Sequence, residues 1–360
     1  MKIAIIGGGI NGIMTAWELC KKNHEVTLFE KTTIMSQTSS ASSKLLHGGL
    51  RYLENLEFRL VKEALGERFF WVNEAPQYVK PIEIFIPIYK YSRRPAWLYK
   101  IGLCIYDLLA GKRNLGKHNS YSKTVMKKLC PELKSEGIIK GFSYFDAQMD
   151  DYKLGTWVAS KLGHYKKFTL RENTSIDTIS ESGEITHQES KEKFEKIINV
   201  TGPWAHELLK TNNINTDHEL DLIRGSHIIV KRQLNCGYFL EVPNERRVFF
   251  VLPYKNKTLI GTTEKRQGLN EAIKPSQEEI ISLINSYNNY FKKEIKLCDV
   301  WQSFAGIRPL IKSSKEANKV TREYAIQTNK NLITVYGGKW TTSRQLAIKI
   351  SNLFKNQTNV

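Results

Sequence analysis

Three glycines that follow a short apolar run give the clearest sign of chemistry in this sequence. Residues 3–6 are β-rich, and Gly7, Gly9 and Gly12 then complete a G-x-G-x-x-G pattern. In such a pattern the first glycine permits a tight turn and the second lets backbone approach a pyrophosphate, while the third lets a helix pack closely on the strand. The expected helix over 13–22 would present unpaired N–H groups and a positive dipole end to phosphates.

An acidic residue at the end of the next expected strand completes a dinucleotide pattern. The strand over 25–30 ends in Glu30, which follows Gly12 by 18 positions. A carboxylate at about this distance binds ribose hydroxyls, and it favours a free 2′-hydroxyl over a 2′-phosphate. The pattern predicts an ADP-containing dinucleotide. It leaves NAD and FAD open, although its place at the start of the chain favours FAD, and an unliganded glycine turn is the alternative.

A hydroxyl-rich segment follows Glu30. Residues 36–43 read SQTSSASS and run into Lys44, His47, Gly48, Gly49 and Arg51. Hydroxyls and backbone N–H groups on such a loop could hold a pyrophosphate or a ribityl chain. Composition alone favours a plain polar linker.

The same segment carries a resemblance to a known family. Residues 38–54 read TSSASSKLLHGGLRYLE, which resembles the signature of FAD-dependent glycerol-3-phosphate dehydrogenases, within the glycine/D-amino-acid oxidase-like flavoproteins. The resemblance recurs in chain order at residues 57–61, 94–97, 199–204, 224–227, 260–263, 306–310 and 337–342. Members of that family usually continue into a C-terminal helical domain, whereas this chain ends at Val360. The chain therefore resembles a short form of the family. The resemblance leaves open whether the protein forms a homodimer and whether it contacts a membrane.

The resemblance implies an α/β fold in which a discontinuous, Rossmann-like FAD-binding domain is interrupted by an antiparallel-sheet substrate domain. The FAD-binding domain is expected over 1–75, 145–215 and 300–360, and the substrate or cap domain over 76–144 and 216–299. The sequence pattern agrees, because a strand over 193–200 precedes Thr201 and Gly202, while strand-like runs over 220–231, 247–253 and 257–263 suit an antiparallel sheet. A last strand over 331–336 precedes Gly337 and Gly338.

Helices are expected between these strands. Apolar spacing predicts helices over 56–73, 95–109 and 152–162, the last capped by Asp150 or Asp151. Ser276 and Glu279 form a capping-box pattern at the start of a helix over 276–291. We expect the apolar residues 97–109 to pack in the core, because the stretch is too short and too interrupted by charge to cross a bilayer.

The resemblance also implies which residues hold FAD. They lie in the glycine turn, the second strand, the hydroxyl-rich loop, the strand after residue 193 and the final motifs. These residues are Gly7, Gly9, Asn11, Gly12, Glu30, Lys31, Ser39, Ser40, Ser42, Ser43, Lys44, His47, Gly48, Gly49, Thr201, Gly202, Trp204, Gly306, Arg308, Gly338, Lys339, Trp340, Thr341 and Thr342.

The implied reaction is oxidation of sn-glycerol 3-phosphate to dihydroxyacetone phosphate, with hydride passing from C2 to flavin N5. Phosphate binding requires clustered cations, and the candidates in matching motifs are Arg51, Arg308, Arg322 and Lys339. Surface salt bridges are the alternative for each of them. Arg322 could lie on an exposed strand, and Tyr52 could bind substrate or simply pack.

His227 is the expected acceptor of the hydroxyl proton, because imidazole titrates near neutrality. His47 is second and could instead contact the flavin. The expected catalytic set is therefore His227, Arg308 and Lys339. A histidine on a strand is more often a hydrogen-bonded structural residue, so that alternative stays open.

Composition limits the partners. The chain has 360 residues and a formal charge of +18. This charge suits a phosphorylated substrate, an anionic membrane or simply a solvated basic surface. A nucleic-acid partner is the weakest interpretation, because the lysines are scattered along the chain. The five cysteines are odd in number and none forms C-x-x-C, which disfavours a disulfide framework or a metal site and favours a reducing cytoplasm. We expect electrons to pass to a quinone at the inner face of the cell membrane.

Three other functions stay open. The chain could pass electrons to oxygen as an oxidase, act on a glycerol-phosphate conjugate or another hydroxy or amino acid, or be a flavin-binding module without catalysis. The joint presence of Arg51, His227, Arg308 and Lys339 disfavours the last.

Overall fold

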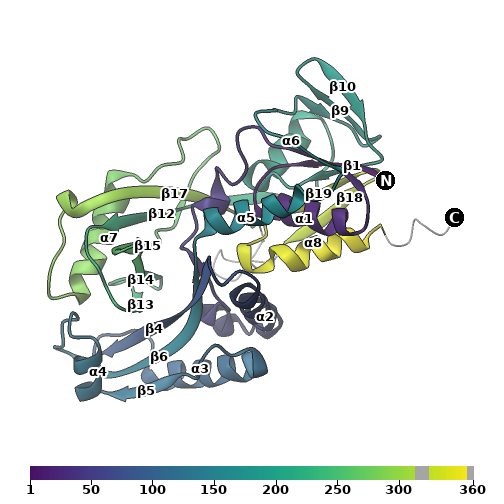
Figure 1. The fold of residues 1–360 in the computed structure, drawn as a ribbon. Helices are drawn as coiled ribbons and strands as arrows, with labels where there is room; N and C mark the ends of the chain where they lie inside the picture. Colours follow the sequence, from purple (N-terminus) through teal and green to yellow (C-terminus); the bar gives the residue numbers. More distant parts are fainter. Residues whose placement is uncertain (313–323, 355–360) are drawn as a thin grey trace.

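The computed structural model describes residues 1–312 and 324–354, and two large sheets dominate it (Figure 1). This is the mixed α/β architecture expected from the sequence. The six-stranded sheet has the order β18 (Ala325–Asn329), β19 (Leu332–Tyr336), β11 (Lys196–Asn199), β1 (Lys2–Ile6), β2 (Glu25–Phe29) and β7 (Phe168–Arg171). All neighbours in it are parallel except β18 and β19.

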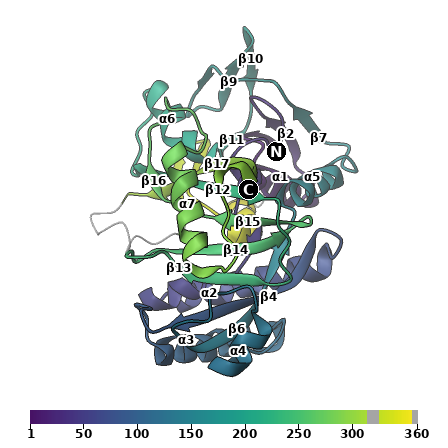
Figure 2. The same ribbon diagram turned by 90° about the vertical axis from the view of Figure 1, so that its left-hand side faces the viewer.

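The second sheet is ten-stranded and covers the side of the molecule opposite the parallel sheet (Figure 2). Its order is β16 (Lys265–Arg266), β12 (Leu220–Val230), β15 (Lys257–Gly261), β14 (Val248–Tyr254), β13 (Gly237–Glu241), β4 (Val79–Tyr89), β6 (Ile138–Met149) and β3 (Leu45–Leu46), with β17 (Val300–Ile311) paired to β12 and β5 (Asn119–Ser122) to β6. A small sheet of β8 (Thr178–Ile179), β9 (Glu184–His187) and β10 (Ser190–Lys193) lies apart from both.

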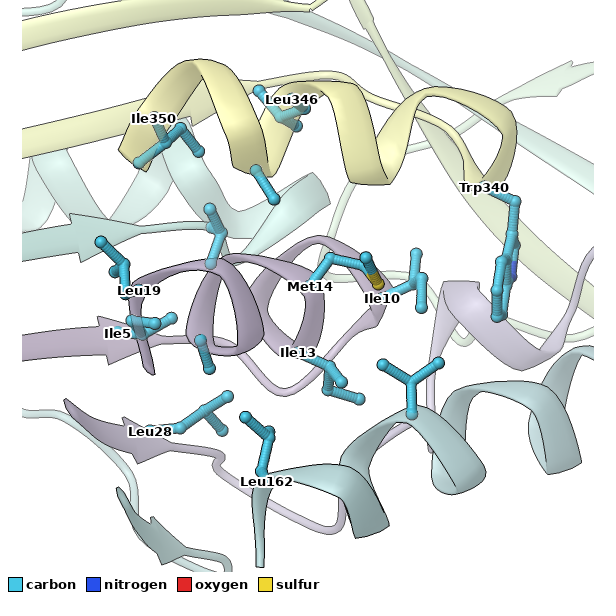
Figure 3. Close-up of a cluster of buried hydrophobic side chains, with 14 of the residues drawn as sticks. Ile5, Ile10, Ile13, Met14, Leu19, Leu28, Leu162, Trp340, Leu346 and Ile350 are labelled. Atoms are coloured by element: carbon cyan, nitrogen blue, oxygen red, sulfur yellow. The ribbon is translucent and has the colours of Figure 1, made fainter. Parts of the chain in front are cut away.

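Helices α1 (Ile10–Lys21), α5 (Asp151–Leu162) and α8 (Ser343–Asn352) cover one face of the parallel sheet. Figure 3 shows α1 between the other two, with Met14 and Leu19 among the buried side chains. At about 25 cal/mol per Å² of apolar surface removed from water, such a cluster is the main stabilising contribution to this half. The described residues include no helix long and apolar enough to span a membrane.

The remaining helices are α2 (Phe58–Glu74), α3 (Ala96–Ala110), α4 (Lys123–Leu129), α6 (Ala205–Thr211) and α7 (Gln277–Tyr290). The predicted capping box is present at α7, where the Ser276 side chain accepts from the Glu279 N–H and the Glu279 carboxylate accepts from the Ser276 N–H. At α5 the cap is Asp150, whose carboxylate accepts from the Lys153 N–H. Asp151 instead forms a buried ion pair with Lys44.

The expectation for residues 97–109 is only half right. One side of α3 is buried through Tyr99, Leu103, Tyr106 and Ala110. The opposite side leaves Trp97 and Leu108 63% and 78% exposed. A helix on a protein surface buries only one stripe of its side chains. The apolar composition of this helix therefore could not predict which of its side chains are exposed.

The division into domains stays a prediction, but strand pairing bears on one of its boundaries. Residues 300–311, assigned above to the FAD-binding part, form β17. That strand pairs with β12 from Leu220↔Ile311 to Val230↔Val300, so its backbone hydrogen bonds lie in the antiparallel sheet.

The turn between β1 and α1 has the geometry that its glycines predict. Gly7 has φ +111°, a conformation that side chains with a Cβ rarely adopt. A Cβ on Gly12 would lie 1.9 Å from the Gly7 carbonyl oxygen. The helix can therefore begin this close to the strand only with glycine at position 12.

Gly12→Ala should lower the free energy of unfolding by about 2 kcal/mol or more, since overpacking costs roughly 1–3 kcal/mol even with milder overlaps. Gly102→Ala is the matched control, because a Cβ there meets only Leu50, at 3.7 Å. Denaturant unfolding of both variants measures the difference. Equal stabilities would contradict the proposed close approach.

Candidate active site

A cavity of about 950 Å³ lies where the carboxyl end of β1 meets the antiparallel sheet. The β1–α1 turn and the hydroxyl-rich loop line one part of it, while β12, β17 and the segment after β19 line another. Ligands of open α/β sheets bind at the carboxyl ends of the strands. The described residues contain no group of acidic, histidine or cysteine side chains arranged to hold a metal ion.

The start of α1 faces this cavity, and its N-cap residue has no side chain that could cap the helix. Gly9 is the N-cap residue and the Ile10 N–H donates to Ser39 Oγ over 3.0 Å. A helix N-terminus of this kind attracts phosphate through its N–H groups and its dipole. At the end of β2 the Glu30 carboxylate lines the cavity and accepts from the Gly8 and Thr32 N–H groups at 2.7 and 2.9 Å. These hydrogen bonds fix Glu30 where a ribose would approach.

The hydroxyl-rich loop is not a free linker. The Ser39 carbonyl accepts from the Trp340 indole N–H over 2.7 Å, and the Thr38 hydroxyl donates to the Ile307 carbonyl over 3.1 Å. The loop thus bridges the start of α1, strand β17 and the 3₁₀ turn Trp340–Thr342. Segments about 300 positions apart in the sequence therefore meet at the cavity.

Three polar atoms of cavity-lining residues have no hydrogen-bond partner among the described residues. They are Asn11 Oδ1, His227 Nδ1 and Lys339 Nζ, and the last of these lies 4.3 Å from the Tyr52 ring centroid. Buried polar atoms are normally satisfied, so their state suits a polar ligand. Gly338 has φ +92°, and a Cβ on it would lie 2.5 Å from Asn11 Nδ2.

Two arginines share one carboxylate at the other end of the cavity. Glu264 Oε1 is 3.4 Å from Arg308 Nη1 and 3.8 Å from Arg51 Nη1. Arg308 Nη2 also donates to the Thr262 hydroxyl over 3.0 Å. The guanidinium groups come from β17 and from the 3₁₀ helix Leu50–Asn55. Arg51 and Arg308 thus form a cationic corner of the cavity, which also contains the acidic Glu264.

His227 is buried between the loop and β17. Its Nε2 is 2.9 Å from Ser43 Oγ, and its ring stacks on Phe304 with centroids 4.9 Å apart. Burial, and then the positive charges of Arg308 and Lys44, hold the pKa of His227 well below its usual range. The imidazole is therefore neutral near pH 7.

Most of the predicted site residues line this one cavity. The predicted cofactor residues that do not line it are Gly12, Ser40, Lys44, Gly48 and Thr342. Two of these residues are bonded to side chains that do not line the cavity. Lys44 pairs with Asp151 at 2.6 Å, and the Gly48 N–H donates to the Tyr106 hydroxyl at 2.8 Å. Arg322 lies outside the described residues.

Sequence reasoning missed Glu264 and Phe304. An acidic residue is not a candidate for a phosphate corner on charge alone, and Phe304 reads as ordinary strand core. Glu264 directly follows the motif at residues 260–263, which was the only signal available.

Comparison with known proteins identifies the family. The model of the family described as "FAD dependent oxidoreductase" matches residues 2–345. The chain belongs to this family. It is 34% identical over 96% of its length to a glycerol-3-phosphate dehydrogenase of Pseudomonas aeruginosa, covering 70% of that protein, and 36% identical over 95% of its length to a D-erythritol 1-phosphate dehydrogenase of Brucella abortus, covering 71%.

The fold agrees with this assignment. The structure of a glycerol-3-phosphate dehydrogenase from Bacillus halodurans, complexed with FAD, is similar with a TM-score of 0.79 at 21% identity; the match covers all of this chain and 65% of that one. Both comparisons give FAD as the cofactor of this chain. The uncapped helix start, the fixed Glu30 and the unpartnered atoms of Asn11 and Lys339 fit such a cofactor.

The depressed pKa of His227 predicts an effect on stability. Below about pH 6.5 an unfolded histidine gains a proton that the folded one does not. The free energy of unfolding should therefore fall as pH drops through this range, by up to about 1.4 kcal/mol per pH unit from this group. His227→Gln should lack this component in denaturant unfolding between pH 7.5 and 5.

The exposed His164 provides the control. His164→Gln should keep the slope of the unchanged protein. A His227→Gln variant with that same slope would show that the buried imidazole does not resist protonation.

Proposed function

We propose that this FAD-dependent oxidoreductase oxidises the C2 alcohol of sn-glycerol 3-phosphate to give dihydroxyacetone phosphate. The observation that carries the proposal is the single cavity shared by a dinucleotide-binding turn, a cationic corner and a neutral buried histidine. Bound FAD supplies a hydride acceptor for the C2 hydrogen. The protein must then bind a phosphate, orient C2 and remove the hydroxyl proton.

Phosphate binding is assigned to Arg51 and Arg308. A guanidinium binds a phosphate through two parallel charge-assisted hydrogen bonds, and both guanidinium groups form ion pairs with Glu264 in this structure. A phosphate dianion would compete with that carboxylate for them. Lys339 adds a third positive charge beside Tyr52.

Removal of the proton is assigned to His227. Its Nε2 lies 2.9 Å from the hydroxyl of Ser43, another residue that lines the cavity, and the stack on Phe304 restricts rotation of the ring. Because the imidazole is neutral, it can take the C2 hydroxyl proton as the hydride leaves. Arg308 nearby keeps the protonated form short-lived, which favours release of the proton to water.

A longer phosphorylated polyol is the second candidate substrate. The similarity to a D-erythritol 1-phosphate dehydrogenase is as high as that to the glycerol-3-phosphate dehydrogenases. Both substrate types present one phosphate and an adjacent secondary alcohol, so the same corner and the same histidine serve either. A quinone remains our proposed electron acceptor, and release of peroxide in air would instead indicate oxygen.

Purified protein should show a flavin spectrum that sn-glycerol 3-phosphate bleaches in the absence of oxygen, because hydride transfer reduces the ring. D-Erythritol 1-phosphate is tested in parallel, and glycerol without phosphate is the control. Bleaching by erythritol phosphate alone would transfer the proposal to the longer substrate. Absence of bleaching with any phosphorylated polyol would overturn it.

Arg308→Ala should raise KM for the phosphorylated substrate by roughly 10- to 100-fold, since a hydrogen bond to a charged group contributes about 1.5–3 kcal/mol. Arg266→Ala is the matched control, because Arg266 is exposed and pairs with Asp221 outside the cavity. Steady-state kinetics with an artificial acceptor measure both. An unchanged KM for Arg308→Ala would contradict phosphate binding by this residue.

A further inference from the structure

A cysteine, a histidine and an aspartate form a chain of contacts at the surface of α3, away from the candidate active site. Cys104 Sγ lies 3.7 Å from His118 Nε2, and His118 Nδ1 lies 2.6 Å from Asp107 Oδ2. None of the three lines the cavity. Figure 1 shows α3 and β5, which begins just after His118, together at the lower edge of the molecule.

The fold brings these residues together by folding the chain back on itself. Cys104 and Asp107 are three positions apart on α3 and therefore share a face of the helix. The 3₁₀ turn Gly111–Arg113 ends the helix, and residues 114–118 return along it. His118 is thereby placed between the thiol and the carboxylate.

Asp107 fixes the orientation of the imidazole. A carboxylate accepts hydrogen bonds, so His118 Nδ1 donates to Asp107 and the ring presents Nε2 to Cys104. Asp107 itself is held by the Asn114 side chain at 2.9 Å and the His118 N–H at 3.0 Å. A nucleophile, a base and a group that orients the base are the parts of an activated thiol.

The surroundings determine which reagents such a thiol would meet. Cys104 is exposed. Between residues 90 and 128 the chain has ten lysines and arginines and one acidic residue, Asp107. Among the basic residues, Lys100 lies one helical turn before Cys104 and Lys117 directly precedes His118, and both are exposed. Positive charge of this kind favours an anionic reagent.

We propose that Cys104 is a reactive thiol that forms mixed disulfides with small anionic disulfides, with His118 as its base and Asp107 as the residue that positions His118. In this exchange His118 takes the thiol proton while Cys104 sulfur attacks one sulfur of the reagent. The new S–S bond forms as the old one breaks, and the released thiolate is protonated. Cys104 is oxidised and the reagent, the oxidant, is reduced to one free thiol.

The chain provides a matched internal control. Cys298 is also exposed, and among the described residues it makes no side-chain hydrogen bond or ion pair. The holoenzyme is treated with 5,5′-dithiobis(2-nitrobenzoate), an anionic disulfide, at pH 7.5, and the two sites are distinguished by peptide mass analysis. We expect Cys104 to react about tenfold faster than Cys298 or more.

Variants test the roles of the three residues. Cys104→Ser should remove the faster of the two cysteine reactions with the disulfide reagent. The same variant should leave flavin reduction by substrate unchanged, so this proposal can fail independently of the proposed function. His118→Gln should bring the Cys104 rate down to that of Cys298, and Asp107→Asn should lower it in part. Equal rates for the two cysteines, or a rate unchanged in His118→Gln, would overturn the proposal.

A structural role for the cluster predicts a different result. If Asp107 and His118 only fasten the turn after α3, their variants lower the unfolding temperature but keep the ratio of the two cysteine rates. A neutral disulfide, 4,4′-dithiodipyridine, distinguishes the effect of the surrounding positive charge from the effect of His118. With this reagent the Cys104 rate should still fall in His118→Gln, but it should no longer change with salt concentration. A Cys104 rate that is the same with and without His118 would also overturn the proposal.

Discussion

Positive charges that share a small cavity repel one another, and this constraint governs the arrangement around the candidate active site. Arg51, Arg308 and Lys339 reach the cavity from three separate segments of the chain. Glu264 lies against both guanidinium groups and compensates part of their charge. The charge of Lys339 is met only by the Tyr52 ring among the described residues. An anionic ligand would relieve the remaining repulsion, and this is the physical basis of the proposed phosphate binding.

The same charges explain why the proposed base is neutral. His227 is buried beside Arg308, with Lys44 behind it, and each of these features disfavours an imidazolium. Lys44 does not reach the cavity, because its ammonium pairs with Asp151 at the start of α5. In this position Lys44 also donates to the Ser40 carbonyl of the hydroxyl-rich loop and adds positive charge near His227. Its contact with the cofactor stays a prediction.

The antiparallel sheet has to lie close to the hydroxyl-rich loop and the β1–α1 turn for these charges to meet. Strands β12 and β17 pair over eleven residue positions and carry His227 and Arg308, respectively. Gly306 makes the approach possible, since a Cβ there would lie 3.0 Å from the Ala41 side chain. The hydroxyl-rich loop is thereby held between the sheet, α1 and Trp340, which is a tertiary arrangement and not a property of its composition.

The sequence by itself determined the glycine turn, the acid at the end of β2, the capping box of α7 and the family, because each depends on residues close together in the chain or on a long run of matching motifs. It also supplied Arg51, His227, Arg308 and Lys339 as candidates, although not their distances. Only the tertiary structure decided that Glu264 joins the two arginines, that Asp150 and not Asp151 caps α5, that Trp97 and Leu108 face outward, and that Cys104 and His118 come within reach of each other. Each of these depends on which face of an element is buried and on what packs against it, and local spacing carries no information about either.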